Sequence, residues 1–252
     1  YAFALCAAAL LMAAGIGKEF LHKDVVEAAR ESALRVLTQG SLHYGGGRAG
    51  VEACCNQDYA RIWAKLLLQK YFQDDRFEQQ VQEDLDYMVD HFHISGVPDE
   101  DCDGTKRALL GKDQLLLEPA EYYGLMIVPL CIGYELFGRE KWLHAAVRLC
   151  NHVVRSSFLD EENCRRVHRA YYAKSDGSWG RLTQPMQIQG NGLTLYGISY
   201  CARLTGNREM EKFLAEMEQG IAHYQTKRGF LRAATGWDTE ADAVPATAWQ
   251  AH

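Results

Sequence analysis

The sequence predicts an all-α protein made of repeated helical hairpins, and three observations support this prediction. Residues 193–204 are apolar on almost every side, which is typical of a helix that is covered all round. After a break at 205–208, apolar side chains recur from Met210 to Tyr224 at the spacing of a helix with one exposed face. The same order of a buried inner helix, a tight turn and a half-exposed outer helix occurs three more times. The chain therefore contains repeated hairpins of one kind.

The other hairpins follow this order from the start of the chain. The first inner helix is an Ala-rich apolar segment, and the next two are apolar runs that start at Tyr59 and Tyr122. The expected inner helix, turn and outer helix of each are 2–14, 15–17 and 19–37; 59–72, 73–75 and 77–92; and 122–136, 137–139 and 140–154. The unequal spacing of the turns favours hairpins joined by loops of different length over a short solenoid repeat.

Length and composition are typical of one globular domain, which we expect to cover 1–252. The chain has 252 residues, of which 48% are apolar, and its net charge of −6 argues against a nucleic-acid partner. The apolar segment 1–14 is too short to span a membrane, and its fit to the hairpin pattern favours an inner helix over a signal peptide. Residues 244–250 resemble the start of a fifth inner helix, so we expect the chain to be a piece of a longer protein. The oligomeric state does not follow from the sequence.

The eight cysteines show no CxxC or metal-ligand spacing. Four of them, Cys6, Cys131, Cys150 and Cys201, lie on helix faces that we expect to be buried. The favoured interpretation is that they are core thiols that pack as small apolar side chains. Neither a disulfide pairing nor a redox compartment follows from them.

The connections that follow the outer helices are much longer than the turns inside the hairpins. Loops of such length are uncommon in compact domains unless they carry a function. Because the hairpins run in the same sense, these loops must emerge at one end, where every inner helix begins. Helix N-termini present unpaired N–H groups and a partial positive charge. This end is the predicted working face, and an acidic small molecule or glycan would be attracted to it.

The first two long loops place candidate catalytic residues at this face. Asn56 and Asp58 begin the second inner helix, where a simple N-cap is the alternative to a functional role. The candidates at the start of the third inner helix are two carboxylates and two phenols, Glu118, Glu121, Tyr122 and Tyr123. The carboxylates either complement the helix dipole or act as acid and base, and a tyrosine could transfer a proton.

One of these loops also carries a candidate calcium site. Residues 99–104 have the D-x-D-x-D-G opening of a calcium loop, in which Asp99, Asp101 and Asp103 would supply oxygen ligands. The twelfth position of that loop is Leu110 and not the expected Glu, so a solvated acidic turn is the alternative. We expect no required cofactor, and calcium is the one candidate.

The third and fourth long loops carry residues suited to bind a sugar acid. Arg165 and Arg166 could hold a carboxylate or sulfate through paired N–H donors, and His168 lies beside them. The alternative for this segment is a basic run on the surface. The further candidates for substrate binding are Trp179, Gln189, Asn191 and Trp237.

Inner helices that line a hollow, outer helices that wrap them, and a mouth rich in aromatic and polar residues resemble the (α/α) toroid domains of glycan-active enzymes. The segments similar in order and spacing to alginate-lyase and heparinase-like polysaccharide lyases are 56–59, 72–76, 103–104 and 118–123. The segments similar to the later repeats of unsaturated glucuronyl hydrolases are 189–192, the run to Asn207, and 237–239. The fold implied by this resemblance is an incomplete (α/α) toroid.

The lyase resemblance implies a role for several of the candidate residues. Asn56 would neutralise a uronate carboxylate, Tyr122 or Tyr123 would pass the proton, and Arg165 or Arg166 would hold the acid group. Removal of the C5 proton of a uronate requires such charge neutralisation.

The same comparison leaves alternatives open. Gln57 departs from the lyase pattern, which often has a histidine base there, and His168 would have to replace it. The hydrolase resemblance instead implies that Asp58, Glu118 or Glu121 is the acid that acts on the sugar. We expect an enzyme that cleaves acidic, uronate-containing glycans, with elimination ahead of hydrolysis or uronyl epimerisation. A helical-repeat scaffold that binds a protein partner is the alternative from another class. A secreted, periplasmic or lysosome-like location is favoured over the cytoplasm.

Overall fold

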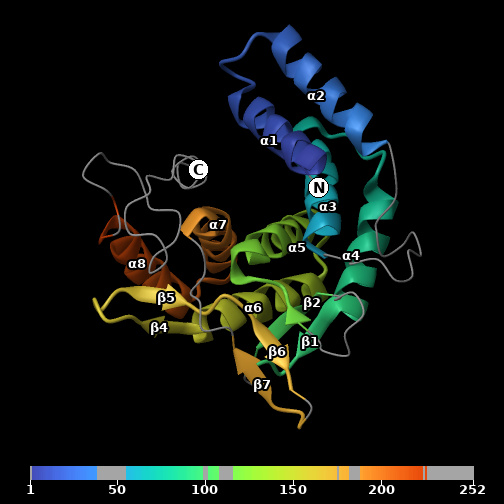
Figure 1. The fold of residues 1–252 in the computed structure, drawn as a ribbon. Helices are drawn as coiled ribbons and strands as arrows, with labels where there is room; N and C mark the ends of the chain where they lie inside the picture. The colour runs from blue at the N-terminus through green and yellow to red at the C-terminus, as the bar shows by residue number, and fades with distance from the viewer. Residues whose placement is uncertain are drawn as a thin grey trace.

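The protein is a row of antiparallel helix pairs (Figure 1). The structure, a computed structural model, describes residues 2–38, 55–98, 102–107, 116–174, 176–181, 188–223 and 225. The helices are α1 (Ala2–Gly17), α2 (Lys23–Leu37), α3 (Cys55–Phe72), α4 (Glu78–Phe92), α5 (Tyr123–Phe137), α6 (Glu140–Arg155), α7 (Ile188–Thr205) and α8 (Arg208–His223). The inner helices α1, α3, α5 and α7 pack side by side in that order, and each packs on the outer helix that follows it. The predicted hairpins are thus confirmed.

The third hairpin shows why the inner and outer helices differ. Every residue of α5 from Tyr123 to Gly133 is buried, as its continuous apolar sequence requires. In α6 the buried residues lie on one face, which includes Trp142 and Leu149. Gly138 adopts the left-handed conformation, with a φ of 67°, and ends α5. The charged face of α6 is therefore free to meet solvent while its apolar face covers α5.

Several helix ends differ from the expected ones. α1 continues through the expected turn at 15–17, and α2 begins at Lys23, four residues later than expected. The His22 side chain accepts a hydrogen bond from the Asp24 N–H at 3.4 Å and caps α2, which explains the later start. α3 and α7 begin four and five residues earlier than expected, at Cys55 and Ile188.

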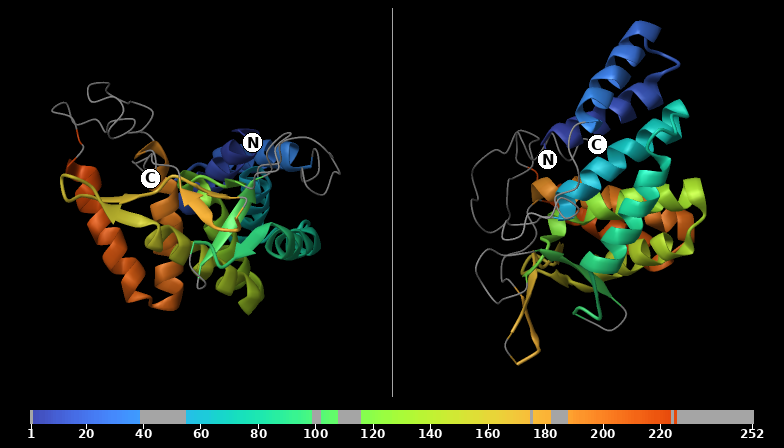
Figure 2. Two further views of the ribbon diagram at one scale, coloured as in Figure 1. Left: turned by 60° about the horizontal axis from the view of Figure 1, so that its bottom comes forward. Right: turned by 90° about the vertical axis from the view of Figure 1, so that its right-hand side faces the viewer.

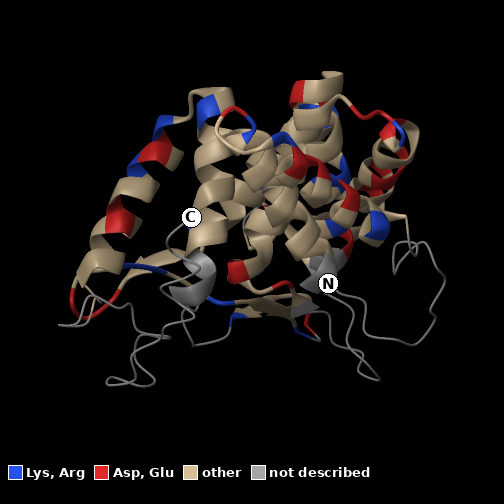
Figure 3. Cartoon of the chain, turned by 90° about the horizontal axis from the view of Figure 1, so that it is seen from above, with Lys and Arg blue, Asp and Glu red and all other residues tan. Residues whose placement is uncertain are grey.

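Short strands occupy the connections that the sequence analysis treated as plain loops. The strands are β1 (His93–Ser95), β2 (Asp103–Arg107), β3 (Leu116–Leu117), β4 (Ser157–Leu159), β5 (Arg165–Val167), β6 (Tyr171–Ala173) and β7 (Trp179–Arg181). Five of them form an antiparallel sheet in the order β1-β2-β3-β6-β7, and β4 pairs with β5. Figures 2 and 3 show these strands across one end of the helices. A short 3-10 helix, η1 (Ala120–Tyr122), leads from the sheet into α5.

The first helix is apolar but covered on one side only. α1 packs mainly on α2 and α3, and Cys6 is exposed, so the expectation that it is a core thiol was wrong. Cys131, Cys150 and Cys201 are buried, as expected. Neither α1 nor any other described helix is long and apolar enough to cross a membrane.

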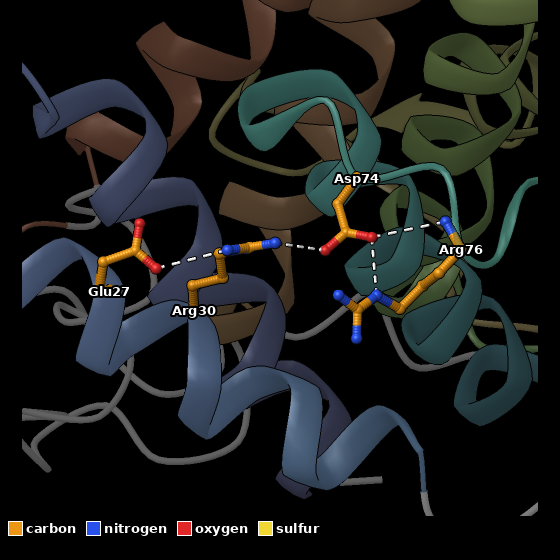
Figure 4. Close-up of polar contacts among 4 residues, drawn as sticks. All are labelled: Glu27, Arg30, Asp74 and Arg76. Carbon is orange, nitrogen blue, oxygen red and sulfur yellow. Dashed lines mark hydrogen bonds and ion pairs between the residues drawn. The ribbon is translucent and has the colours of Figure 1, made fainter.

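An ion-pair cluster ties the first outer helix to the next hairpin (Figure 4). Asp74, in the turn between α3 and α4, has a side chain that is only 6% exposed. It accepts hydrogen bonds from the Arg30 guanidinium of α2 and from the Arg76 guanidinium, each at 2.7 Å. Burial opposes ionisation of Asp74, but the hydrogen bonds from Arg76 and Arg30 outweigh it and lower the pKa of the carboxyl.

Replacement of Asp74 should therefore destabilise the protein. We expect Asp74→Ala to lower the free energy of unfolding by about 2 kcal/mol, because two charge-assisted hydrogen bonds are lost while the arginines stay partly solvated. Urea unfolding followed by circular dichroism measures the difference. Asp75 is the exposed neighbour, and Asp75→Ala should change the same free energy by less than about 0.5 kcal/mol. Equal effects of the two substitutions would contradict a stabilising role for the cluster.

Candidate active site

The first turn of α5 lies in direct contact with the second turn of α7. The Thr194 hydroxyl of α7 donates a hydrogen bond to the Ala120 carbonyl at 2.8 Å. The same hydroxyl oxygen accepts a hydrogen bond from the Gly124 N–H at 3.4 Å. A Cβ atom on Gly124 would be only 2.0 Å from the Leu193 carbonyl oxygen, so only glycine permits this approach. The two inner helices thus begin at the same end of the molecule.

The sheet meets this end through β2. The Tyr123 hydroxyl accepts a hydrogen bond from the Thr105 N–H at 3.3 Å, and the Thr105 carbonyl accepts one from the Glu118 N–H at 2.8 Å. Thr105 pairs with His93 of β1, whose Nε2 is 2.8 Å from the Tyr59 hydroxyl in the first turns of α3. The starts of α3, α5 and α7 therefore share one polar layer beneath the sheet, as hairpins that run in the same sense require.

Two carboxylates lie in this layer at the start of α5. Glu118 is 1% exposed and Glu121 is 4% exposed. The Arg169 Nε donates to the Glu121 Oε1 at 2.8 Å, and the Arg169 carbonyl accepts the Ala120 N–H at 2.7 Å. The segment that carries both carboxylates is thus held by β2, by α7 and by Arg169, which lies two residues before β6. Such multiple attachment fixes side chains in the way that catalysis requires.

Aromatic and histidine rings pack behind the carboxylates. Tyr123 stacks on His152 of α6, with ring centroids 5.1 Å apart, and Tyr171 of β6 meets the His152 ring edge-on. His152 Nδ1 donates to the Val97 carbonyl at 2.6 Å. Burial lowers the pKa of His152 to about 4, so the ring is neutral at pH 7. His152 is therefore suited to support the site and not to titrate near neutrality.

The predicted anion-binding arginines are engaged within the protein. Arg165 contacts Glu216 of α8 through Nε at 2.8 Å and Nη2 at 2.7 Å. Arg166 is 7% exposed and lies 3.6 Å from the Asp160 carboxylate. A role for either in substrate binding stays a prediction, and Arg165 would have to exchange Glu216 for the substrate.

The remaining predicted catalytic residues take different places. Asp58 is 2% exposed in the first turn of α3. Burial raises the pKa of Asp84 in α4, and the nearby Asp58 carboxylate adds to this effect. Tyr122 is half-buried at the end of η1. His168 stacks on Phe158, with ring centroids 4.3 Å apart, and not on the carboxylates. Of the predicted set, the structure thus brings together Glu118, Glu121 and Tyr123.

The predicted binding residues are described only in part. Trp179 is half-buried in β7 and packs against the small cluster of Val97, Leu117 and Tyr171. The predicted residues whose side chains, or whole placement, lie outside the described residues are Asn56, Gln189, Asn191 and Trp237. Asn56 belongs to α3, and Gln189 and Asn191 belong to α7.

The calcium prediction remains untested. Asp103 forms an ion pair with Arg148 of α6 at 2.7 Å, while Asp99 and Asp101 lie outside the described residues. Within the described ranges no group of three or more acidic, histidine or cysteine side chains could hold a metal ion.

Sequence reasoning missed the residues that hold the site together. Arg169 belongs to the basic run that the sequence shows, but nothing in the sequence pairs it with Glu121, which is 48 residues away. Thr105 and Thr194 are fully buried, yet isolated threonines carry no pattern that distinguishes them. Only the packing of distant segments selects them.

Known proteins match this chain in structure and not in sequence. No protein-family model matches it, and no curated protein matches it. The α-1,6-mannanase GH76A of Salegentibacter sp. HEL1_6 is 13% identical, with a TM-score of 0.65 over 92% of this chain and 64% of that one. A family 76 mannosidase of Bacteroides thetaiotaomicron VPI-5482 is 12% identical, with a TM-score of 0.64 over 90% and 62%. An unsaturated glucuronyl hydrolase variant with dGlcA-Glc-Rha-Glc is 13% identical, with a TM-score of 0.71 over 98% and 64%.

The chain has the (α/α) toroid fold. This confirms the fold class and the resemblance that the sequence predicts. The chain spans less than two thirds of the length of these three toroid proteins, which agrees with an incomplete toroid.

Proposed function

We propose that this toroid chain belongs to a glycoside hydrolase whose site lies where α3, α5 and α7 begin. The observation that carries the proposal is the pair Glu118 and Glu121, which are buried at a helix N-terminus and held in place through the backbone of their own segment. Most glycosidases use two Asp or Glu residues, one to protonate the leaving-group oxygen and one to act as base or nucleophile. A buried pair fixed between three elements is suited to that chemistry.

The geometry favours hydrolysis over the eliminative cleavage that the sequence analysis placed first. Of the two tyrosines that elimination could use to pass a proton, Tyr123 is fully buried and accepts the Thr105 N–H, and Tyr122 is half-buried at the end of η1. It would also use Arg165 or Arg166 to hold a uronate, and both contact carboxylates of the protein.

A uronate-containing glycan is the finer proposal for the substrate. It is supported by the match to the hydrolase that was crystallised with a dGlcA-containing oligosaccharide. The rival class is neutral mannan, because α-1,6-mannanases share the fold and one was crystallised with α-1,6-mannotriose. Ring positions for either would lie over the start of α5, with the leaving-group oxygen facing the carboxylates.

The test is a glycan panel with the full-length protein. Reducing-end release should appear on uronate-containing oligosaccharides, without the ultraviolet absorbance of an unsaturated product. Glu118→Gln and Glu121→Gln should each lower the rate by at least about a hundredfold while helical circular dichroism is kept. Glu209, exposed on α8, gives the control Glu209→Gln, which should be as active as the parent.

Each other outcome has a definite meaning. Cleavage of mannan alone would support the proposed hydrolase activity but would replace uronate-containing glycans by neutral mannan as the substrate. An ultraviolet-absorbing product would restore elimination. Activity that survives both glutamate substitutions would overturn the proposed site, and a lack of both cleavage and sugar binding would favour the scaffold alternative.

A further inference from the structure

Arg169 is attached twice to the segment that carries the carboxylates. Its main-chain carbonyl accepts the Ala120 N–H at 2.7 Å, and its Nε donates to the Glu121 Oε1 at 2.8 Å. Its side chain is 25% exposed, whereas that of Glu121 is 4% exposed. The guanidinium thus lies between the buried carboxylate and solvent. Arg169 is held both at its main chain and at its side chain.

A buried carboxyl next to a fixed arginine differs from one that is only buried. Burial alone favours the neutral acid, because the charged form loses hydration. A guanidinium at hydrogen-bond distance favours the ion, since it supplies both opposite charge and a donor. Glu118, at 1% exposure, lies three residues before Glu121. The contact with Arg169 therefore favours the ionised form of Glu121.

We infer that Arg169 is a positioning residue that holds Glu121 as an oriented carboxylate, so that Glu121 is the base or nucleophile. The inference rests on the proposed function for its catalytic meaning, but the ionisation of Glu121 is testable without a substrate. An ionised, oriented carboxylate is what the base or nucleophile of glycosidic hydrolysis requires.

Several other titratable or charged groups lie at this end of the molecule. They are Glu118 in the same segment, Tyr122 and Tyr123 at the start of α5, Asp58 of α3, His93 of β1, Asp103 of β2 with Arg148 of α6, His152 of α6, and His168 beside Arg169. Arg169 contacts the Glu121 carboxylate directly, so its removal should act on Glu121 first.

The experiment compares Arg169→Met with Arg169→Lys in the full-length protein. After Arg169→Met, the ¹³Cδ signal of Glu121 should titrate at a pH higher by about one unit or more, and the acidic limb of the pH profile of kcat/KM should move by the same amount. The rate near pH 6 should fall at least tenfold, in kcat more than in KM. In Arg169→Lys, Glu121 should titrate at a pH close to that of the parent, because the positive charge is kept. The rate should recover less, because the planar contact of the guanidinium is lost.

A matched control removes an arginine–carboxylate contact elsewhere. Arg139 lies 2.7 Å from the Asp86 carboxylate, beside the turn between α5 and α6. Arg139→Met should leave the Glu121 titration and the pH profile unchanged. An Arg169→Met protein that loses stability but keeps both the Glu121 titration and the profile would overturn the inference and make Arg169 merely structural.

The two proposals fail in different ways. If Glu121→Gln is inactive while Arg169→Met leaves the titration unchanged, the hydrolase site stands and only the role of Arg169 is lost. If Glu121→Gln keeps full activity while Arg169→Met shifts the titration, the contact with Arg169 does fix the ion, but the reaction does not use it and the catalytic assignment falls.

Discussion

Gly124→Ala is expected to destabilise the protein by about 3 kcal/mol or more. The new Cβ would lie 2.0 Å from the Leu193 carbonyl oxygen, 2.4 Å from its carbon and 2.8 Å from the Thr194 nitrogen. These are backbone atoms of α7, which cannot move without displacing the helix. The displacement would also weaken the hydrogen bond from Thr194 to Ala120, so the loss exceeds the gain in helix propensity of about 1 kcal/mol. Chemical unfolding of the parent and the variant measures the difference.

A second glycine of α5 provides the control. A Cβ on Gly133 would meet the Leu85 Cδ1 at 2.7 Å and the Trp142 Cε3 at 3.1 Å. The closer of these atoms is the end of a side chain that can change rotamer, so Gly133→Ala should cost less than about 1 kcal/mol. If both substitutions are tolerated equally, α5 and α7 do not meet closely near their N-terminal ends, and the convergence on which the candidate site depends is wrong.

The helical core was predictable because its signals are local. A run such as 123–133 is apolar on every side, and Trp142 and Leu149 recur at helical spacing, so inner and outer helices could be distinguished from the sequence. The strands were missed because they are two to five residues long and gain their stability from distant partners. Leu116, for example, pairs with Tyr172.

The candidate site was predictable only where it follows from helix polarity. Glu118, Glu121 and Tyr123 were selected because they precede or begin an inner helix, and the structure brings them together. The same reasoning does not reveal what each side chain contacts. Tyr123 is covered by β2, and Arg165 is engaged by Glu216, which is 51 residues away. Pairing over such separations depends on how the loops fold across the helix ends.

Acid should destabilise the protein, because two neutral histidines lie in the layer beneath the sheet. Burial lowers the pKa of His93 and of His152 to about 4 from the ordinary value of 6.5. Below pH 6.5 the unfolded chain binds protons that these rings in the folded protein do not. Their contribution to stability is therefore complete above pH 6.5 and is lost as the pH falls to about 4, by about 3 kcal/mol for each ring.

Asp84 acts in the opposite direction over part of this range. Burial raises the pKa of Asp84 to about 6, although Lys65, 3.9 Å away, favours its ion. Because the folded protein holds this proton more tightly than the unfolded chain, Asp84 adds up to about 3 kcal/mol of stability between pH 6 and 4. The histidines together outweigh it, and the lowered pKa of Asp74 acts in the same direction as theirs, so we expect a net loss of stability between pH 7 and pH 4.

His152→Asn separates the histidine contribution from the rest. An Asn amide can still donate to the Val97 carbonyl but does not titrate, so the variant should be less stable than the parent at pH 7 and should lose about 3 kcal/mol less on acidification. His144 lies exposed on the same helix, and His144→Asn should leave the parent's pH dependence in place. Urea unfolding at pH 7, 5.5 and 4 gives the pH dependence of the free energy of unfolding for the parent and the two variants. Equal pH dependence of the His152→Asn protein and the parent would mean that the His152 ring is hydrated, and that the polar layer beneath the sheet, which includes Glu118 and Glu121, is not buried.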